Sequence, residues 1–136
     1  MAKQLHPIVK LAKEAVENYI EAQRLPVAIH GWTDKPTQVI SKARYAFVSR
    51  YLTILEAMQT KRLVVAVYNN AIKKDYLNCH PMAQKMIIGR DPQEIANRLV
   101  ALKPETEKLM INQAYRWARG QTWEKLTNEY QTLWQS

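Results

Sequence analysis

The chain has 136 residues, of which 47% are hydrophobic and 24% are charged, with only three glycines and six prolines. This length and composition are typical of one globular domain and exclude a disordered, collagen-like or linker-rich chain. A formal net charge of +8 favours anionic partners, with nucleic acid first and an anionic membrane surface second.

Cysteine content and hydropathy limit the cellular setting. Cys79 is the only cysteine, which excludes an intramolecular disulfide and argues against a secreted, disulfide-stabilised scaffold. No apolar run approaches the roughly 20 residues that a membrane span needs, and the amino terminus MAKQLHPIVK lacks the apolar block of a signal peptide. We therefore expect a protein without a membrane span that is not secreted and is located in the cytoplasm or in a virion.

The first predicted helix begins near Pro7, because a proline at the first helical position lacks an N–H that would have no partner there. Apolar residues then recur at helical spacing as far as Ile20. The helix is expected to end before Pro26, since the residue before a proline is pushed away from helical dihedrals. Residues 25–36 contain two prolines and a glycine and predict a loop.

A second, basic helix is predicted from Pro36 to Thr60, with an apolar face that covers about half its circumference. The next segment, LVVAVYN, begins at Leu63 and has a β-branched run that favours a strand. No second convincing strand is present to pair with it. We therefore interpret this segment as helical.

The last third of the chain has clear helix boundaries. A short apolar helix is expected from Met82 to Ile88, and later helices are expected to begin at Asp91–Pro92, at Pro104 and after Thr122. The predicted fold is all-α with six or seven helices, in which an amino-terminal helix, loop and basic helix precede a four-helix-bundle-like carboxyl-terminal part. We expect a single domain over 1–136, with a basic amino-terminal region at 1–60 and a helical bundle at 61–136.

Positive charge is concentrated between Lys35 and Lys74. This stretch holds eight lysines and arginines against one acid, Glu56, and so carries +7 of the chain's +8. Lysine and arginine beside small hydroxyl side chains suit contact with phosphates. The predicted nucleic-acid-binding residues are Lys42, Arg44, Arg50, Lys61, Arg62, Lys73 and Lys74, with Lys3, Lys10 and Lys13 as a secondary set.

No pattern in the sequence indicates catalysis or metal binding. Cys79 and His80 are adjacent, but neighbouring residues usually point apart, and a single cysteine is more often a small buried apolar residue. The three histidines share no spacing typical of a zinc site, and the glycines stand alone rather than in a phosphate-binding loop. We therefore expect a protein that is not an enzyme and holds no cofactor or metal.

Residues 102–127 form a capped helical hairpin with a recognisable pattern. Its markers are Leu102, Pro104, Glu105 and Glu107, followed after an apolar helix by Gly120, Thr122, Glu124 and Leu126. This pattern resembles the first two-thirds of the helix-turn-helix of sigma-factor region 4. The resemblance implies a transcriptional regulator that uses residues 102–136, with Arg116, Arg119 and Lys125 more important than the central lysines. In that family a recognition helix follows, whereas this sequence ends at Ser136.

The arrangement of the whole chain is similar to that of the DNA-wrapping major coat proteins of archaeal filamentous viruses. The similarity lies in an amino-terminal helix, a loop and a basic helix before a helical bundle, and in the charge split of +7 for residues 1–74 and +1 for residues 75–136. It implies helices that line the genome and a bundle that builds the outer wall. Glu14, Glu17 and Glu21 depart from this pattern, because they would have to face away from the DNA.

The leading hypothesis is a structural, non-enzymatic protein that coats or wraps duplex DNA through phosphate contacts and associates with itself into a dimer or filament. A transcriptional regulator is the first alternative. The second is a helical adaptor for an acidic protein, whose charge speeds association.

Overall fold

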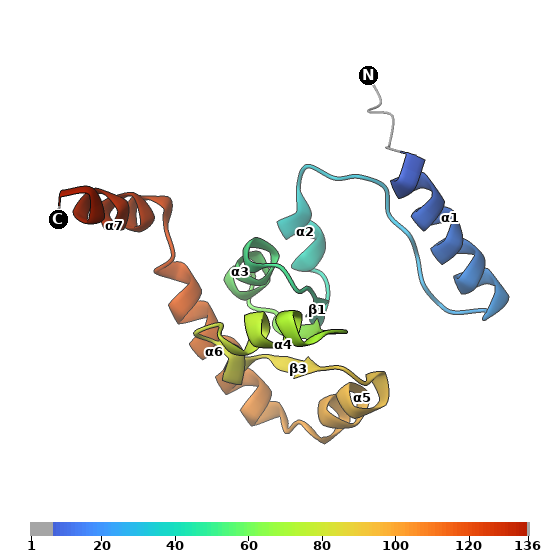
Figure 1. Ribbon diagram of the computed structural model, residues 1–136. Helices are drawn as coiled ribbons and strands as arrows, with labels where there is room; N and C mark the ends of the chain where they lie inside the picture. Colours follow the sequence, from blue (N-terminus) through green and yellow to red (C-terminus); the bar gives the residue numbers. More distant parts are fainter. Residues whose placement is uncertain (1–6, 136) are drawn as a thin grey trace. The chain divides into compact units, whose positions relative to one another are not determined.

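The computed structural model describes residues 7–135 and is 61% helical, with seven α-helices and a small parallel sheet (Figure 1). The elements in chain order are α1 (Pro7–Ala22), α2 (Pro36–Ile40), β1 (Tyr45–Phe47), α3 (Tyr51–Gln59), β2 (Leu63–Val67), α4 (Ala71–Asn78), the 3-10 helix η1 (Ala83–Lys85), β3 (Ile87–Gly89), α5 (Pro92–Ala101), α6 (Pro104–Arg119) and α7 (Trp123–Gln135).

The sheet has three strands in the order β1-β2-β3, and both neighbouring pairs are parallel. Tyr45 pairs with Leu63, and Val65 pairs with Ile87. Helix α3 connects β1 to β2, while α4 and η1 connect β2 to β3. The apolar run of β2 is buried over its first four residues, as expected for the central strand of a parallel sheet that is covered on both faces.

The expectation of a purely all-α fold is wrong. The segment that begins at Leu63 is the strand that its β-branched residues favour, and its partners lie inside two predicted helices. One partner, Tyr45–Phe47, interrupts the helix predicted from Pro36 to Thr60, and the other, Ile87–Gly89, replaces the end of the helix predicted from Met82. Pairing with distant strands therefore overrides the local helical spacing of these short segments.

Helices cover the two faces of the sheet and do not form the expected four-helix bundle. Ala46, Val64 and Ala66 belong to one core cluster, which also contains buried residues of α3, α4 and α6. Leu63, Val65 and Ile87 belong to a second cluster, which α5 closes. Helix α6 contributes to both clusters: Ala114 and Ala118 to the first, and Met110 and Ile111 to the second. Each fully buried aliphatic side chain here stabilises the fold by about 1.5–3 kcal/mol relative to its exposed state.

The chain divides into two compact units, Met1–Asp34 and Lys35–Ser136. In the described part of the first unit, α1 is an exposed amphipathic helix that begins at Pro7, as predicted. The second unit holds the sheet and the other six α-helices. The sheet therefore belongs to the unit that begins with the basic stretch.

Candidate anion-binding site

The parallel sheet divides the connections of the second unit into two groups. All strands point the same way, so the chain leaves every strand at one edge, here called the carboxyl edge, and enters every strand at the opposite amino edge. The residues that follow the three strands begin at Val48, Tyr68 and Arg90. Open α/β sheets bind ligands outside the carboxyl ends of their strands. The carboxyl edge is therefore the expected location of a binding site.

A hollow of about 240 Å³ lies at this edge, between the connections that follow β2 and β3. We call it the carboxyl-edge hollow. Its lining residues are Tyr68, Asn69, Asn70, Ala71, Lys74 and Arg90. Two of them are cations, Lys74 and Arg90, both are exposed to solvent, and no acid lines the hollow. The hollow is therefore electropositive.

Asn70 and Ala71, at the start of α4, are among the residues that line the hollow. Asn70 caps the helix, because its side-chain oxygen accepts a hydrogen bond of 2.8 Å from the backbone N–H of Lys73. Its amide nitrogen donates to the side-chain oxygen of Asn69 over 2.9 Å, which fixes the orientation of the cap. The N–H of Lys74 donates to the Asn70 carbonyl. The remaining first-turn amides, of Ala71 and Ile72, have no intrahelical acceptor, and such amides attract anions.

Lys73 joins the connections that follow β1 and β2. Its ammonium donates a hydrogen bond to the backbone carbonyl of Ser49 and lies 4.5 Å from the centroid of the Tyr76 ring. Arg50 is exposed at the start of α3, next to Ser49. Three of the predicted phosphate-binding residues, Arg50, Lys73 and Lys74, therefore lie at the carboxyl edge.

The other four residues of the central set precede strands and lie at the amino edge. Lys42 and Arg44 come before β1, and Lys61 and Arg62 come before β2. The five residues of β2 separate the two edges by about 16 Å at a rise of roughly 3.3 Å per residue. The predicted set is therefore divided between two edges of the sheet.

Arg44 has a structural partner at the amino edge. Its guanidinium donates to both carboxylate oxygens of the buried Glu107, over 2.8 Å and 3.3 Å. This hydrogen bond and the attraction between the two charges raise the pKa of Arg44 above its ordinary value. The pair fixes the start of α6 beside the entry to β1.

Lys61 takes part in a second amino-edge cluster. Its ammonium lies 4.6 Å from the centroid of the Tyr115 ring, and the guanidinium of Arg119 lies 5.7 Å from the same centroid. Lys61 also has a φ of 58°, in the left-handed region that non-glycine residues rarely adopt. Both cations therefore lie against the same tyrosine ring.

The secondary set lies in the first unit. Lys10 and Lys13 form exposed ion pairs with Glu14 and Glu17, at 4.0 Å and 3.4 Å. Exposed pairs of this kind contribute only a few tenths of a kcal/mol. Lys3 lies outside the described residues.

The sequence prediction did not include Arg90, Asn69 and Asn70, because Arg90 lies outside the basic stretch Lys35–Lys74 and the two asparagines carry no charge. The signal that identifies them is a polar residue placed within a few residues of the end of an apolar strand. That signal can be used only when LVVAV and IIG are recognised as paired strands.

Cys79 and the histidines do not line the carboxyl-edge hollow. Over residues 7–135 no group of three or more His, Cys, Asp or Glu side chains is placed to hold a metal ion. Cys79 is exposed, whereas His80 is buried and its Nδ1 accepts a hydrogen bond of 3.0 Å from the N–H of Met82. Burial lowers the pKa of His80. His80 therefore has a role in packing between Tyr51 and Trp117, whose rings lie 5.7 Å and 5.1 Å from its own.

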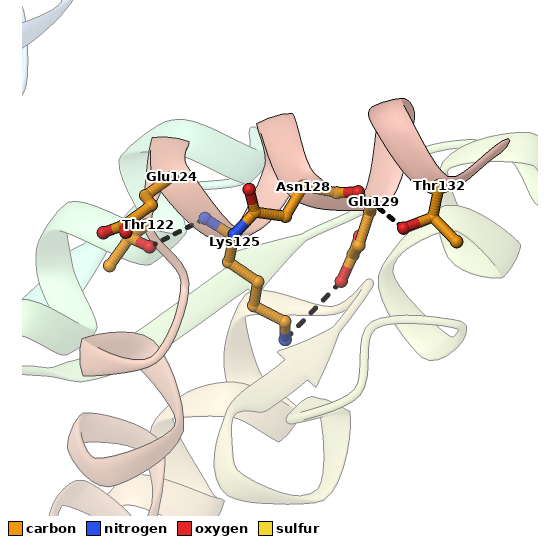
Figure 2. A pocket seen from close by; sticks show the side chains of 6 residues that line it. All are labelled: Thr122, Glu124, Lys125, Asn128, Glu129 and Thr132. Carbon is orange, nitrogen blue, oxygen red and sulfur yellow. Dashed lines mark hydrogen bonds and ion pairs between the residues drawn. The ribbon is translucent and has the colours of Figure 1, made fainter. Parts of the chain in front are cut away.

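A larger hollow of about 390 Å³ lies along α7 and its cap. Figure 2 shows its six side chains, which all come from the segment between Thr122 and Thr132. Lys125 pairs with Glu129 at 3.9 Å, and Thr132 donates to the backbone carbonyl of Asn128. One helix and its cap alone form this surface. It therefore offers no convergent groups to a ligand.

None of the described helices combines the length and the apolarity needed to cross a bilayer. No protein-family model, curated protein or solved structure matches this chain. The geometry and charge of the two sheet edges are therefore the observations that bear on function.

Proposed function

We propose that the protein binds the phosphate group of a small phosphorylated ligand in the carboxyl-edge hollow. The observation that carries this proposal is the convergence of Lys74, Arg90 and the capped start of α4 on one hollow at the carboxyl ends of parallel strands. Arginine supplies a planar fork of donors that matches phosphate oxygens, and lysine supplies a point charge. Free amides at a helix start add donors with a partial positive charge.

The size of the hollow limits what it holds. Its volume of about 240 Å³ is below the roughly 300–1,000 Å³ of pockets that enclose whole ligands. A phosphate or diphosphate group fits inside, and the rest of the ligand extends over the exposed sheet edge. The hollow lacks a lining carboxylate or histidine, so the proposal concerns binding rather than acid–base catalysis.

Calorimetric titration with pyrophosphate at low salt tests this proposal, using variants that remove one charge at a time. Arg90→Gln and Lys74→Gln each remove a charge from the hollow, whereas Lys42→Gln and Lys61→Gln remove the same charge at the amino edge. A hydrogen bond to a charged group contributes about 1.5–3 kcal/mol, so each hollow variant should weaken binding roughly 10- to 100-fold. The amino-edge controls should bind nearly as well as the wild type.

Two results contradict the proposal. One is the absence of pyrophosphate binding at low salt. The other is an equal loss of affinity in the amino-edge controls, because net charge rather than the hollow would then explain binding.

We propose duplex DNA as a second candidate ligand, at the amino edge. The observation that favours it is the placement of two exposed cations, Lys61 and Arg119, against the ring of Tyr115. Exposed cations of this kind suit contacts with the phosphates of a nucleic-acid backbone. The hypothesis of a DNA-coating protein depends on this edge.

The same variants separate the two candidates. For duplex DNA, Lys61→Gln should weaken binding and reduce the slope of log K against log salt by about one, whereas Arg90→Gln should have little effect. Binding of DNA that does not depend on salt, or that depends only on the hollow variants, would contradict this second candidate.

A further inference from the structure

The two outer strands of the sheet, β1 and β3, each pair with β2 on one side only. The other side of such a strand, here called its outer side, presents a row of backbone N–H and C=O groups that can pair with another chain. Many proteins cover this row with one of their own helices or loops. In this sheet the outer sides of β1 and β3 differ.

The outer side of β3 is in contact with α5. The N–H of Tyr68 donates to the carbonyl of Gly89 over 3.2 Å, so Ile87 and Gly89 pair with β2, and Ile88 between them points away from it. The carbonyl of Ile88 accepts a hydrogen bond of 2.7 Å from the guanidinium of Arg98, on α5. A side chain of the protein itself therefore occupies this position.

The outer side of β1 has no such contact. The N–H of Val48 donates to the carbonyl of Val65 over 3.0 Å, so Ala46 and Val48 pair with β2, whereas Tyr45 and Phe47 direct their N–H and C=O groups away from it. Within residues 35–135, no backbone or side-chain group forms a hydrogen bond with these outward groups. They are therefore open to another extended chain.

The sequence around β1 is basic. Residues 35–55 contain four lysines and arginines and no acid. Arg44 is paired with Glu107. Lys42 and Arg50, each three residues from an end of β1, are exposed and form no ion pair with a described residue. Phe47 lies between them and is 65% exposed. A chain bound here therefore meets backbone donors and acceptors, an aromatic ring and a cation beyond each end of the strand.

We propose that the outer side of β1 binds an extended acidic segment of a partner protein as a fourth strand of the sheet. An extended peptide presents N–H and C=O groups in alternation, so it satisfies both the donors and the acceptors of Tyr45 and Phe47. Acidic side chains near the ends of the segment complement the charges of Lys42 and Arg50. Apolar side chains in its centre cover the ring of Phe47.

Two other occupants match this surface less well. A second copy of the chain, paired through its own β1, would bring Lys42 and Arg50 toward the same cations of the first copy, and like charges opposite each other are destabilising. A row of phosphates in a nucleic acid accepts hydrogen bonds from N–H groups and cations but offers no donors to the outward carbonyls. An acidic peptide complements all of these groups.

Amide hydrogen exchange of the full chain, followed by NMR, tests whether the outer side of β1 is open. In the free protein the amides of Tyr45 and Phe47 should exchange much faster than those of Ala46 and Val48, because only the second pair is bonded to β2. Slow exchange at both Tyr45 and Phe47 in the free protein would mean that another segment of the chain covers this side, and would overturn the proposal.

Fluorescence anisotropy with a labelled probe peptide tests the occupant. The probe has alternating valines and threonines in its centre and two aspartates at each end. It should bind the wild type and slow the exchange of the Tyr45 and Phe47 amides. A probe with N-methyl groups on consecutive central residues lacks donors on both of its sides and should not bind. A probe with lysines in place of the aspartates should bind much more weakly. Absence of binding by the acidic probe, or equal binding by either altered probe, would overturn the proposal.

Variants of β1 separate the backbone contribution from that of the ring. Phe47→Pro removes the outward N–H and leaves the bonds between β1 and β2 in place, whereas Phe47→Ala removes the ring and keeps the N–H. The proline variant should bind the acidic probe roughly 2- to 10-fold more weakly than the alanine variant, because one hydrogen bond is lost. Equal affinity of the two variants would overturn the backbone pairing.

A second pair of variants tests the charges and does not alter the strand. Lys42→Gln with Arg50→Gln should weaken binding of the acidic probe. The matched control, Lys103→Gln with Lys108→Gln, removes the same charge from exposed residues at α6 and should bind as the wild type does. An equal loss of affinity in both double variants would overturn the proposal, because net charge alone would then explain binding.

Discussion

Gly89 lies where β3 ends and α5 packs against the sheet, and replacing it with alanine tests this packing. A Cβ atom at position 89 would lie 2.7 Å from Cγ1 and 3.1 Å from Cδ1 of Ile95. Carbon atoms in contact are normally about 3.5–4.0 Å apart. Ile95 is 4% exposed and branched at Cβ, so its Cγ1 cannot move aside without leaving a stiff rotamer. Crowding, rather than backbone strain, limits this site, since Gly89 has no positive φ.

The expected cost of Gly89→Ala combines two opposing terms. Overpacking a core costs about 1–3 kcal/mol. Replacing glycine with alanine lowers the conformational entropy of the unfolded chain, which stabilises the folded protein by about 0.4–1 kcal/mol when the native backbone tolerates alanine. We therefore expect a net loss of about 1–2 kcal/mol. In an Ile95→Ala background the crowding is absent, and the same change at Gly89 should stabilise the protein by about 0.4–1 kcal/mol.

Urea unfolding followed by circular dichroism, on the wild type, both single variants and the double variant, measures this coupling. The double-mutant cycle should give a coupling free energy of about 1–3 kcal/mol, in the direction that favours the double variant. An equal cost for Gly89→Ala in both backgrounds would refute the packing of α5 on β3. A matched m value in all four proteins shows that the comparison concerns one unfolding transition.

Three further predictions concern His80 and Asn70. Because burial lowers the pKa of His80 below its ordinary value of 6.5, the unfolded chain binds this proton at a higher pH than the folded chain. Stability should be complete above pH 6.5 and fall as pH decreases from 6.5 toward the folded pKa. His80→Gln should flatten this part of a urea-midpoint profile, and an unchanged slope would contradict the prediction. Asn70→Ala should cost about 0.5–2 kcal/mol in urea unfolding through loss of the α4 cap, and an unchanged stability would contradict the capping role. Asn70→Asp should keep the cap but weaken pyrophosphate binding, and an unchanged affinity would count against an anion at this helix start.

The helix starts could be predicted because their signals are local. Pro7 begins α1, Asp91 caps α5 by accepting from the N–H of Glu94 at 2.9 Å, Pro104 begins α6, and Thr122 caps α7. Each signal depends on atoms within one turn of the helix. These starts are confirmed at the predicted residues.

The strands could not be predicted in the same way, since their stability comes from distant residues. Tyr45–Phe47 and Ile87–Gly89 have three residues each, too few to show an alternating pattern. Both become strands because they pair with Leu63–Val67, which supplies the apolar centre of the sheet. Without a recognised partner, the central segment itself was interpreted as helical.

The candidate site shows why a run of charge along a sequence is a poor guide to a surface in a parallel fold. Arg44 and Arg50 are close in the sequence, but β1 lies between them and places them at opposite edges of the sheet. Lys74 and Arg90 are much farther apart in the sequence, yet they line one hollow, because each follows a strand. Each cation must therefore be assigned to the start or the end of its nearest strand before charges are grouped. This grouping adds Arg90 to the candidate phosphate-binding residues, because it lines the hollow. It removes Arg44, because the guanidinium of Arg44 is already paired with the carboxylate of Glu107.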